Sequence, residues 1–330
     1  MPDRHPKVLL AVLCAVAALA ILAALATGSA HISLAETIDA LRGAAPEGTR
    51  TLVLGLRLPR AMTAFAVGGL LAVAGVLMQV LLRNPLAEPY ILGTSGGAAV
   101  AALAVMMLGF GSATINVAAF GGALAAMLIV FSIARGSGNW TPSRLLLTGV
   151  VLASGFTAAT TLLLALSPDR NLRGMLFWLM GDLSFAYEPL PLLAVLAALV
   201  AAATLAARHL NVLARGDLEA AIVGMPVTGF RVLVFAAASL ATAISVTSVG
   251  VIGFIGLVVP HLVRLAVGGD HRWLVPASAL AGASLLVVAD TLARTILAPR
   301  QLPVGALTAA IGVPLFLLLM RRRRGAGLQG

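Results

Sequence analysis

Lysine and cysteine are almost absent from this chain of 330 residues, in which Lys7 is the only lysine and Cys14 the only cysteine. A single cysteine cannot build a disulfide framework, and because Cys14 lies in an apolar run we expect its thiol to serve as packing. The phosphate-binding loop G-x-x-x-x-G-K-[ST] is excluded too, because it requires a lysine after its last glycine. The chain therefore lacks this route to hydrolysing ATP itself.

Charged and aromatic residues are also scarce. Only 10% of the residues are charged and 5% aromatic, whereas 60% are hydrophobic and the mean hydropathy is +1.05. The net charge of +10 could suggest nucleic acid, but apart from Arg321 to Arg324 the basic residues are scattered over the loops rather than clustered. We therefore expect a polytopic membrane protein, with the lipid bilayer and not a nucleic acid as its surroundings.

Enzyme motifs are missing as well. The sequence contains neither H-E-x-x-H nor G-x-S-x-G, so a zinc hydrolase and a serine hydrolase are not indicated. The histidines are scattered over different segments, which argues against a metal site: His5, His31, His209, His261 and His271. We expect no catalytic residues, no metal ligands and no cofactor bound by this chain.

Long apolar runs dominate what is present. Residues 61–82 carry no charge, and about 20 apolar residues suffice for a helix to cross the roughly 30 Å hydrocarbon core of a bilayer. This run is preceded by Arg57-Leu58-Pro59-Arg60 and followed by Arg83-Asn84-Pro85-Leu86-Ala87-Glu88-Pro89. Polar groups at both ends of a span suit a protein that passes something through a membrane, so a transporter is the first hypothesis.

The chain has eight long intervals without Lys, Arg, Asp or Glu: residues 8–35, 61–82, 89–134, 145–168, 189–207, 232–263, 273–289 and 301–320. The third interval is more than twice one span and contains Gly109-Phe110-Gly111-Ser112, a natural turn, so it should hold two helices. An all-α membrane fold follows, because a barrel would show short alternating strands instead.

The interval 232–263 is too long for one span and too short for two full ones. Gly250, Gly253 and Gly256 interrupt it. We predict a full helix, then non-helical backbone around Gly250 that is buried in protein or faces water, and then a short helix from near Gly253 to near Arg264. The total becomes ten transmembrane helices.

Charge at the two ends supports an even number of crossings. Arg4 and Lys7 begin the chain and Arg321 to Arg324 end it, so the positive-inside tendency favours cytoplasmic positions for both termini. The first run could be a secretory signal, because small residues follow it at 26–30. Its length and the parity argument favour an uncleaved first span at about 8–28.

No soluble domain is visible, so residues 1–330 are expected to form a single transmembrane domain. There is a hint of internal symmetry: Arg60 and Arg231 each open a span that leads to a glycine-containing segment, followed by Asn84-Pro85 in one case and Pro260-His261 in the other. In a ten-helix topology these spans run in opposite directions, an inverted-repeat-like arrangement.

The energy source is the next question. An ion-driven transporter needs ionisable groups inside its spans, and here only Asp290 and His261 come close, each as a hydrogen-bonded helix terminus or as a relay. A transport pathway without ionisable groups for ion coupling must take its energy from a partner protein. Residues 216–226 predict a short helix that begins with acidic residues and ends at Gly224 and Pro226. This helix is either the contact with that partner or a plain connecting loop.

Several motifs in order resemble the FecCD-type permease family between about 57 and 321. They are Arg57-Leu58-Pro59-Arg60, Arg83-Asn84-Pro85-Leu86-Ala87, Leu92-Gly93-Thr94-Ser95-Gly96-Gly97, Gly253-Phe254-Ile255-Gly256-Leu257-Val258-Val259-Pro260-His261-Leu262-Val263-Arg264 and Leu302-Pro303-Val304-Gly305. The resemblance implies the membrane subunit of an ATP-binding-cassette (ABC) importer for ferric siderophores, haem or vitamin B12. It also implies a homodimer of ten-helix subunits, two cytoplasmic ATPase subunits that use ATP and Mg, and a periplasmic substrate-binding protein.

Site residues follow from the same resemblance. Arg57, Arg60 and Arg294 match positions that dock glutamates of the binding protein, although interfacial anchoring is an alternative for Arg57 and Arg60. The remaining matches are the ATPase-coupling residues Asp217, Glu219, Ala220, Ala221 and Gly224, the inner-gate residues Thr141, Pro142 and Ser143, and the outer-mouth residues Phe177, Trp178 and Met180, for which an interfacial aromatic belt is the alternative.

Three positions depart from the family pattern. Gln301 stands where a glutamate is common, Pro142 is unusual in the gate, and Glu88-Pro89-Tyr90 replaces Asp-Pro-Gly in a predicted inner loop. We expect a bacterial inner-membrane permease that moves a ferric siderophore, cobalamin or haem inward, with specificity mainly in the binding protein. The alternatives are an ion-coupled secondary transporter or exporter, and a membrane scaffold or receptor.

Overall fold

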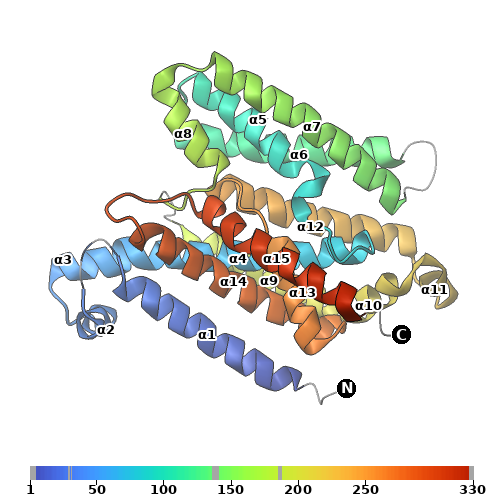
Figure 1. The fold of residues 1–330 in the computed structure, drawn as a ribbon, viewed down its shortest axis with the longest axis horizontal. Coiled ribbons are helices and arrows are strands. Elements are labelled where there is room, and N and C mark those ends of the chain that lie inside the picture. The colour runs from blue at the N-terminus through green and yellow to red at the C-terminus, as the bar shows by residue number, and fades with distance from the viewer. Residues whose placement is uncertain (1–4, 29, 31, 136–140, 185–187, 327–330) are drawn as a thin grey trace.

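The computed structural model describes residues 5–28, 30, 32–135, 141–184 and 188–326, with side chains up to residue 318. Within these ranges every regular element is a helix and no strand occurs, which confirms the all-α fold (Figure 1). Arg4, His31 and the side chains of Arg321 to Arg324 lie outside the described part.

Ten apolar helices match the charge-free intervals: α1 (Pro6–Ala26), α4 (Leu58–Leu81), α5 (Thr94–Met107), α6 (Ser112–Arg135), α7 (Pro142–Leu166), α9 (Pro189–Leu205), α12 (Val227–Val249), α13 (Ile255–Val267), α14 (His271–Thr295) and α15 (Val304–Ala326). By length and composition, six are able to cross a membrane, or seven if α9 and α10 (Ala207–Arg215), bent by 63°, form one span. α5, α13 and the described apolar part of α15 are shorter. Ten crossings therefore stays a prediction.

Short helices lie between the long ones. They are α2 (Leu34–Arg42), α3 (Glu47–Arg50), a π-helical stretch (Thr51–Arg57) that runs into α4, a 3-10 turn (Pro89–Leu92), α8 (Asp169–Leu179), α10 and α11 (Asp217–Ile222). Figure 1 shows α2 and α3 at one end of the long axis and α10 and α11 at the opposite end. The polar segments of the sequence thus gather at two ends, as spanning helices require.

Helix α4 is the centre of the molecule. It is apolar all round and nearly all of its side chains from Ala64 to Leu81 are buried, the pattern of a helix enclosed by others. It packs most extensively on α14, where Gly68 and Gly282 face each other: a Cβ added to Gly68 would overlap the carbonyl oxygen of Gly282. Small residues at this crossing let the two backbones approach closely.

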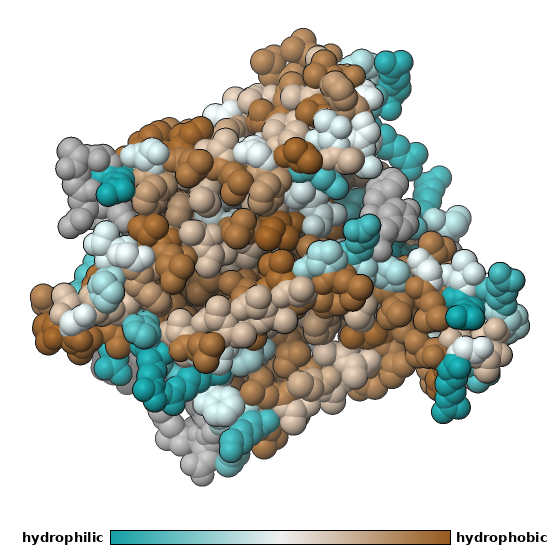
Figure 2. Space-filling model, turned by 180° about the vertical axis from the view of Figure 1, so that it is seen from behind, coloured by the Kyte–Doolittle hydropathy of each residue, from teal (hydrophilic) through white to brown (hydrophobic). Residues whose placement is uncertain are grey.

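Helices α5 to α8 form a separate layer above this core, on the far side of α12 in the view of Figure 1. The predicted turn at 109–112 is confirmed, because α5 ends at Met107 and α6 begins at Ser112. Only 6% of the residues in the apolar stretch of α7 and 28% of those in α6 are buried. Figure 2 shows hydrophobic residues over the middle of the rear face and hydrophilic ones toward its edges. Such a surface suits lipid or another apolar partner.

The first predicted span is a helix, α1, and 22% of the residues in its apolar stretch are buried. The packing role that we predict for Cys14 is wrong, because its side chain is exposed on this helix. Since α1 contacts α14 along one side only, most of its apolar side chains face outward, and the cysteine is among them.

The break after α12 is confirmed. Backbone at 250–254 is non-helical, Gly250 and Phe254 have φ of 75° and 70°, and α13 begins at Ile255. Two amides of this break have side-chain partners: Phe254 N–H donates to Glu88 Oε1 at 2.9 Å, and Ile252 N–H donates to the Tyr90 hydroxyl at 3.2 Å. Buried backbone groups need such partners.

This contact gives residues 88–90 a structural role that the sequence did not reveal. Glu88 and Tyr90 precede the short helix α5, and the break that they satisfy precedes the short helix α13. Each half of the chain thus has a long helix, a link without α-helix and a short helix, and the two links touch. This matches the inverted-repeat-like arrangement, in which broken helices meet at the repeat interface.

Candidate functional site

A cluster of arginines lies where α4 and α14 meet, at the end that carries α2 and α3. Arg60 binds Asp290 through one edge of its guanidinium: Nε lies 3.1 and 3.0 Å from the two carboxylate oxygens, and Nη2 lies 2.9 Å from Oδ1. Arg294 pairs with the same carboxylate at 3.2 Å. Asp290 is only 2% exposed, so it is an ion-paired residue inside the protein. Such a bidentate pair holds both partners in fixed orientations.

Arg57 behaves differently from its sequence neighbours. Its side chain is buried, and its guanidinium donates to the carbonyls of Leu25 at 2.7 Å, Ala26 at 3.2 Å and Ala30 at 2.6 Å. Carbonyls at the end of a helix lack intrahelical donors, so Arg57 completes the end of α1. The alternative of an interfacial anchor is wrong for Arg57, because it faces protein instead of the membrane surface.

Docking by Arg57, Arg60 and Arg294 stays a prediction. We call these three residues and Asp290 the arginine cluster; it has three guanidinium groups and one carboxylate, and therefore an excess of positive charge. Gln301 Oε1 accepts hydrogen bonds from Arg60 at 3.1 Å and from the Ser184 hydroxyl at 3.3 Å. A glutamate at position 301 would have reduced the excess, so the departure from the family pattern keeps the cluster more positive.

Asp290 is the member of this cluster whose role the sequence reasoning left open. It offered a hydrogen-bonded terminus or a relay, and the structure gives an ion pair that organises two arginines. The spacing to Arg294 is four residues, the distance at which side chains meet on one helix face. That spacing was visible in the sequence, whereas the pairing with Arg60 across 230 residues was not.

The opposite end carries the predicted coupling residues. The short helix is confirmed as α11, and Gly224 closes it with φ of 77°. Asp217 pairs with Arg231 at the start of α12 and with Arg83 after α4 at 3.5 Å, so its carboxylate ties α11 to two membrane helices. Ala220 is fully buried against the chain.

What α11 exposes is mainly apolar. Leu218, Ile222 and Val223 are 77%, 76% and 67% exposed, and Glu219 and Ala221 are exposed beside them. The sequence predicts an apolar face on this helix, but the predicted coupling residues include Glu219 and Ala221 and not these three large ones. Large exposed apolar residues that lie together mark a contact with a protein or with a membrane. ATPase coupling through this surface stays a prediction.

The predicted inner gate begins α7. Thr141 caps the helix by accepting the Arg144 amide at 3.3 Å, and Pro142 occupies the first helical position, which suits proline because no amide partner is needed there. Ser143 is exposed in the first turn. Pro142 is therefore locally compatible with the helix, and the gate itself stays a prediction, next to residues 136–140 that lie outside the described part.

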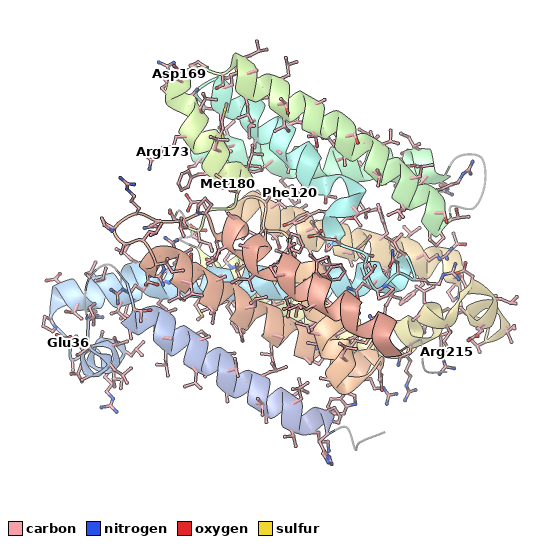
Figure 3. All side chains as sticks on the ribbon, in the orientation of Figure 1. Glu36, Phe120, Asp169, Arg173, Met180 and Arg215 are labelled. Atoms are coloured by element: carbon pink, nitrogen blue, oxygen red, sulfur yellow. The ribbon has the colours of Figure 1, made fainter. Side chains whose placement is uncertain are left out.

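The predicted outer mouth lies on and just after α8, which Figure 3 traces from Asp169 through Arg173 to Met180. Phe177, Trp178 and Met180 are all half-buried. The Arg173 guanidinium lies 5.7 Å from the centroid of the Phe177 ring, a cation–π contact. The Met180 carbonyl accepts the Gly305 amide at 2.9 Å and so joins α8 to the start of α15. Lining a mouth stays a prediction for all three.

No three His, Cys, Asp or Glu side chains of the described residues lie together as a metal site would need. The model of the FecCD transport family matches residues 15–322. The chain belongs to this family.

Named relatives agree with the family assignment. The hemin transport system permease protein HmuU of Yersinia pestis is 44% identical over 82% of this chain and 83% of its own length. The vitamin B12 import system permease protein BtuC of Shigella boydii is 39% identical over 93% of both chains. A solved inward-facing ABC transporter assigned to the metal-chelate type has a TM-score of 0.85 and 28% identity, over 96% of this chain and all of its own.

FecCD family members are permease subunits of ABC transporters, multi-pass membrane proteins that work with ATPase and substrate-binding partners. The chain is accordingly a transport component and not an enzyme, because ATP is hydrolysed in separate subunits.

Proposed function

We propose that this chain is the permease of an ABC importer in a bacterial inner membrane, with both termini in the cytoplasm. As a homodimer it moves a metal chelate from a periplasmic binding protein to the cytoplasm. The observation that carries the proposal is α11, which offers Leu218, Ile222 and Val223 to a partner at the end opposite the arginine cluster. One end suits an ATPase and the other suits an acidic binding protein.

The arginine cluster supports docking through its net charge. Arg60 and Arg294 keep 14% and 10% of their side chains exposed, while Asp290 holds them in place. Fixed guanidinium groups with excess positive charge attract and orient carboxylates. In this proposal Arg60 and Arg294 meet the binding protein, and Arg57 supports them from behind by holding α1.

The substrate class rests on the relatives. Hemin, vitamin B12 and metal-chelate substrates, as their names state, are all metal ions enclosed by an organic ligand. We propose a substrate of this class, with a ferric siderophore, cobalamin and haem as the candidates. The permease binds no cofactor of its own, and ATP and Mg²⁺ belong to the partner ATPase.

Uptake should follow ATP and not an ion gradient. Because ion coupling needs ionisable groups within the spans, and the chain offers few, energy must come from the ATPase. The permease is reconstituted in liposomes with its ATPase subunits and binding protein. Uptake of haem, cyanocobalamin and a ferric hydroxamate is then measured with ATP or with a proton or sodium gradient. Uptake driven by a gradient without ATP would establish the ion-coupled alternative and refute the proposal.

Gly224 offers a test of coupling through α11. Its φ of 77° disfavours any side chain, although nothing lies within 4 Å of an added Cβ. Gly224→Ala should cost about 1–2 kcal/mol in the present shape of α11 and lower uptake per ATP several-fold. Gly229→Ala is the matched control, because it too has open space but an ordinary φ. Equal uptake per ATP in both variants would contradict a coupling role for this segment.

A further inference from the structure

The side chain of Asn211 joins α10 to the beginning of α14. Its Nδ2 donates to Asp270 Oδ1 at 2.8 Å, while its Oδ1 accepts the His271 amide at 3.0 Å and lies 2.6 Å from the Nδ1 of the same histidine. His271 is fully buried, and Asn211 and Asp270 are half-buried. We call these three residues the Asn211 clamp. Hydrogen bonds shielded from water hold their partners more firmly than exposed ones do.

The clamp supplies hydrogen-bond acceptors for free backbone amides at the N-terminus of α14. Asp270 caps α14 by accepting the Arg272 amide at 3.1 Å, and Asn211 takes the His271 amide, which has no partner inside the helix. Helix α10 therefore cannot shift relative to α14 without breaking at least two hydrogen bonds and exposing a free amide. The contact behaves as a joint and not as a sliding surface.

The position of the clamp connects the two candidate sites. Only Gly216 separates α10 from α11, so α11 follows directly in the chain after the helix that bears Asn211. At its other end α14 carries Asp290 and Arg294 of the arginine cluster. With a rise of about 1.5 Å per residue, the 20 residues from Asp270 to Asp290 span about 30 Å of continuous helix. One helix thus bears the clamp at one end and the cluster at the other.

We propose that Asn211 is a positioning residue for transport: through Asp270 and His271 it passes displacement of α11 to α14, and thereby to the arginine cluster. This inference rests on the proposed function, because it takes α11 as the ATPase contact. Packed helices move as rigid bodies, so a fixed joint at one end of α14 makes its other end respond. Without the joint, α11 and α10 would move while α14 stayed in place.

An exchange of groups separates this role from simple stability. Asn211→Asp sets two carboxylates against each other and should open the clamp. Adding Asp270→Asn puts the amide opposite the new carboxylate, so the donor and acceptor change places and the net charge of the wild type returns. Arg208→Ala, an exposed residue of the same helix, is the control for α10 itself.

The readout is hydrogen–deuterium exchange in the full complex of permease and ATPase subunits, without nucleotide and with ATP plus vanadate. In the wild type and in Arg208→Ala, exchange should change both in α11 and in residues 289–300. In Asn211→Asp the change in α11 should persist, while the change in 289–300 should fall at least about fivefold, the low end of coupling between sites. The double variant should recover it.

The possible failures are distinguishable. If wild-type α11 does not respond to nucleotide, the proposed function fails at its ATPase contact. If α11 responds but residues 289–300 do not, or if Asn211→Asp keeps the wild-type response there, the role of Asn211 is refuted. A double variant that stays silent at 289–300 also refutes it, because restoring the hydrogen bonds should restore the joint.

Discussion

Replacing Gly75 by alanine is expected to abolish most of the folded protein, even though alanine normally favours a helix. Gly75 lies where α4 crosses α13, and a Cβ there would overlap the carbonyl oxygen of Gly256 and approach its carbon to 2.6 Å. Backbone atoms cannot swing aside as a side chain can. Overpacking costs about 1–3 kcal/mol where the structure can relax, and more is expected at this rigid crossing.

The measurement is the yield of monodisperse protein in detergent and its thermal midpoint. Gly121→Ala is the matched control, because Gly121 lies within the apolar helix α6 and has nothing within 4 Å of an added Cβ. That control should be neutral or slightly stabilising. Equal behaviour of the two variants would mean that α4 and α13 are farther apart than the structure indicates.

The second large effect is expected at Asp290. Asp290→Ala removes the only carboxylate of the arginine cluster and leaves Arg60 and Arg294 without their ion-pair partner in a nearly buried position. Breaking a buried ion pair by removing one partner costs about 3–5 kcal/mol. The two guanidinium groups also repel each other once the carboxylate is gone. We expect a large fall in thermal stability and loss of binding-protein docking.

Asp290→Asn and Asp39→Ala are the comparisons. The first keeps a hydrogen-bond acceptor of the same shape and should fall between wild type and alanine. The second removes an exposed carboxylate at the same end and should change little. Thermal unfolding in detergent and binding-protein pull-down at low and high salt report the two effects. A stable Asp290→Ala variant would show that the arginines find other partners.

The sequence was most informative where polarity and backbone shape alone decide the outcome. Charge-free runs located the apolar helices, glycines at 109–111 marked a turn, and Gly250 marked a break followed by a short helix. These features depend on local chain properties, namely apolar length and the freedom of glycine. The count of crossings is harder, because short helices such as α5 and α13 do not reveal by length whether they span.

The contacts that individual side chains make could not be predicted from the sequence. Arg57 and Arg60 stand three residues apart in one motif, yet Arg57 binds carbonyls at the end of α1 and Arg60 binds Asp290. Asn211 is not part of any sequence motif, and its role depends on Asp270, which is 59 residues away in the chain. Such contacts join residues far apart in the chain, and only the packed structure brings them together.

The contact between residues 88–90 and the break at 250–254 limits how chimeras of two family members can be built. Glu88 and Tyr90 belong to the first half of the chain and supply the acceptors that Phe254 and Ile252 of the second half need. A hybrid that joins the first half of one family member to the second half of another must therefore inherit a matching pair of links. We expect a hybrid with mismatched links to leave the amides of Ile252 and Phe254 without these acceptors.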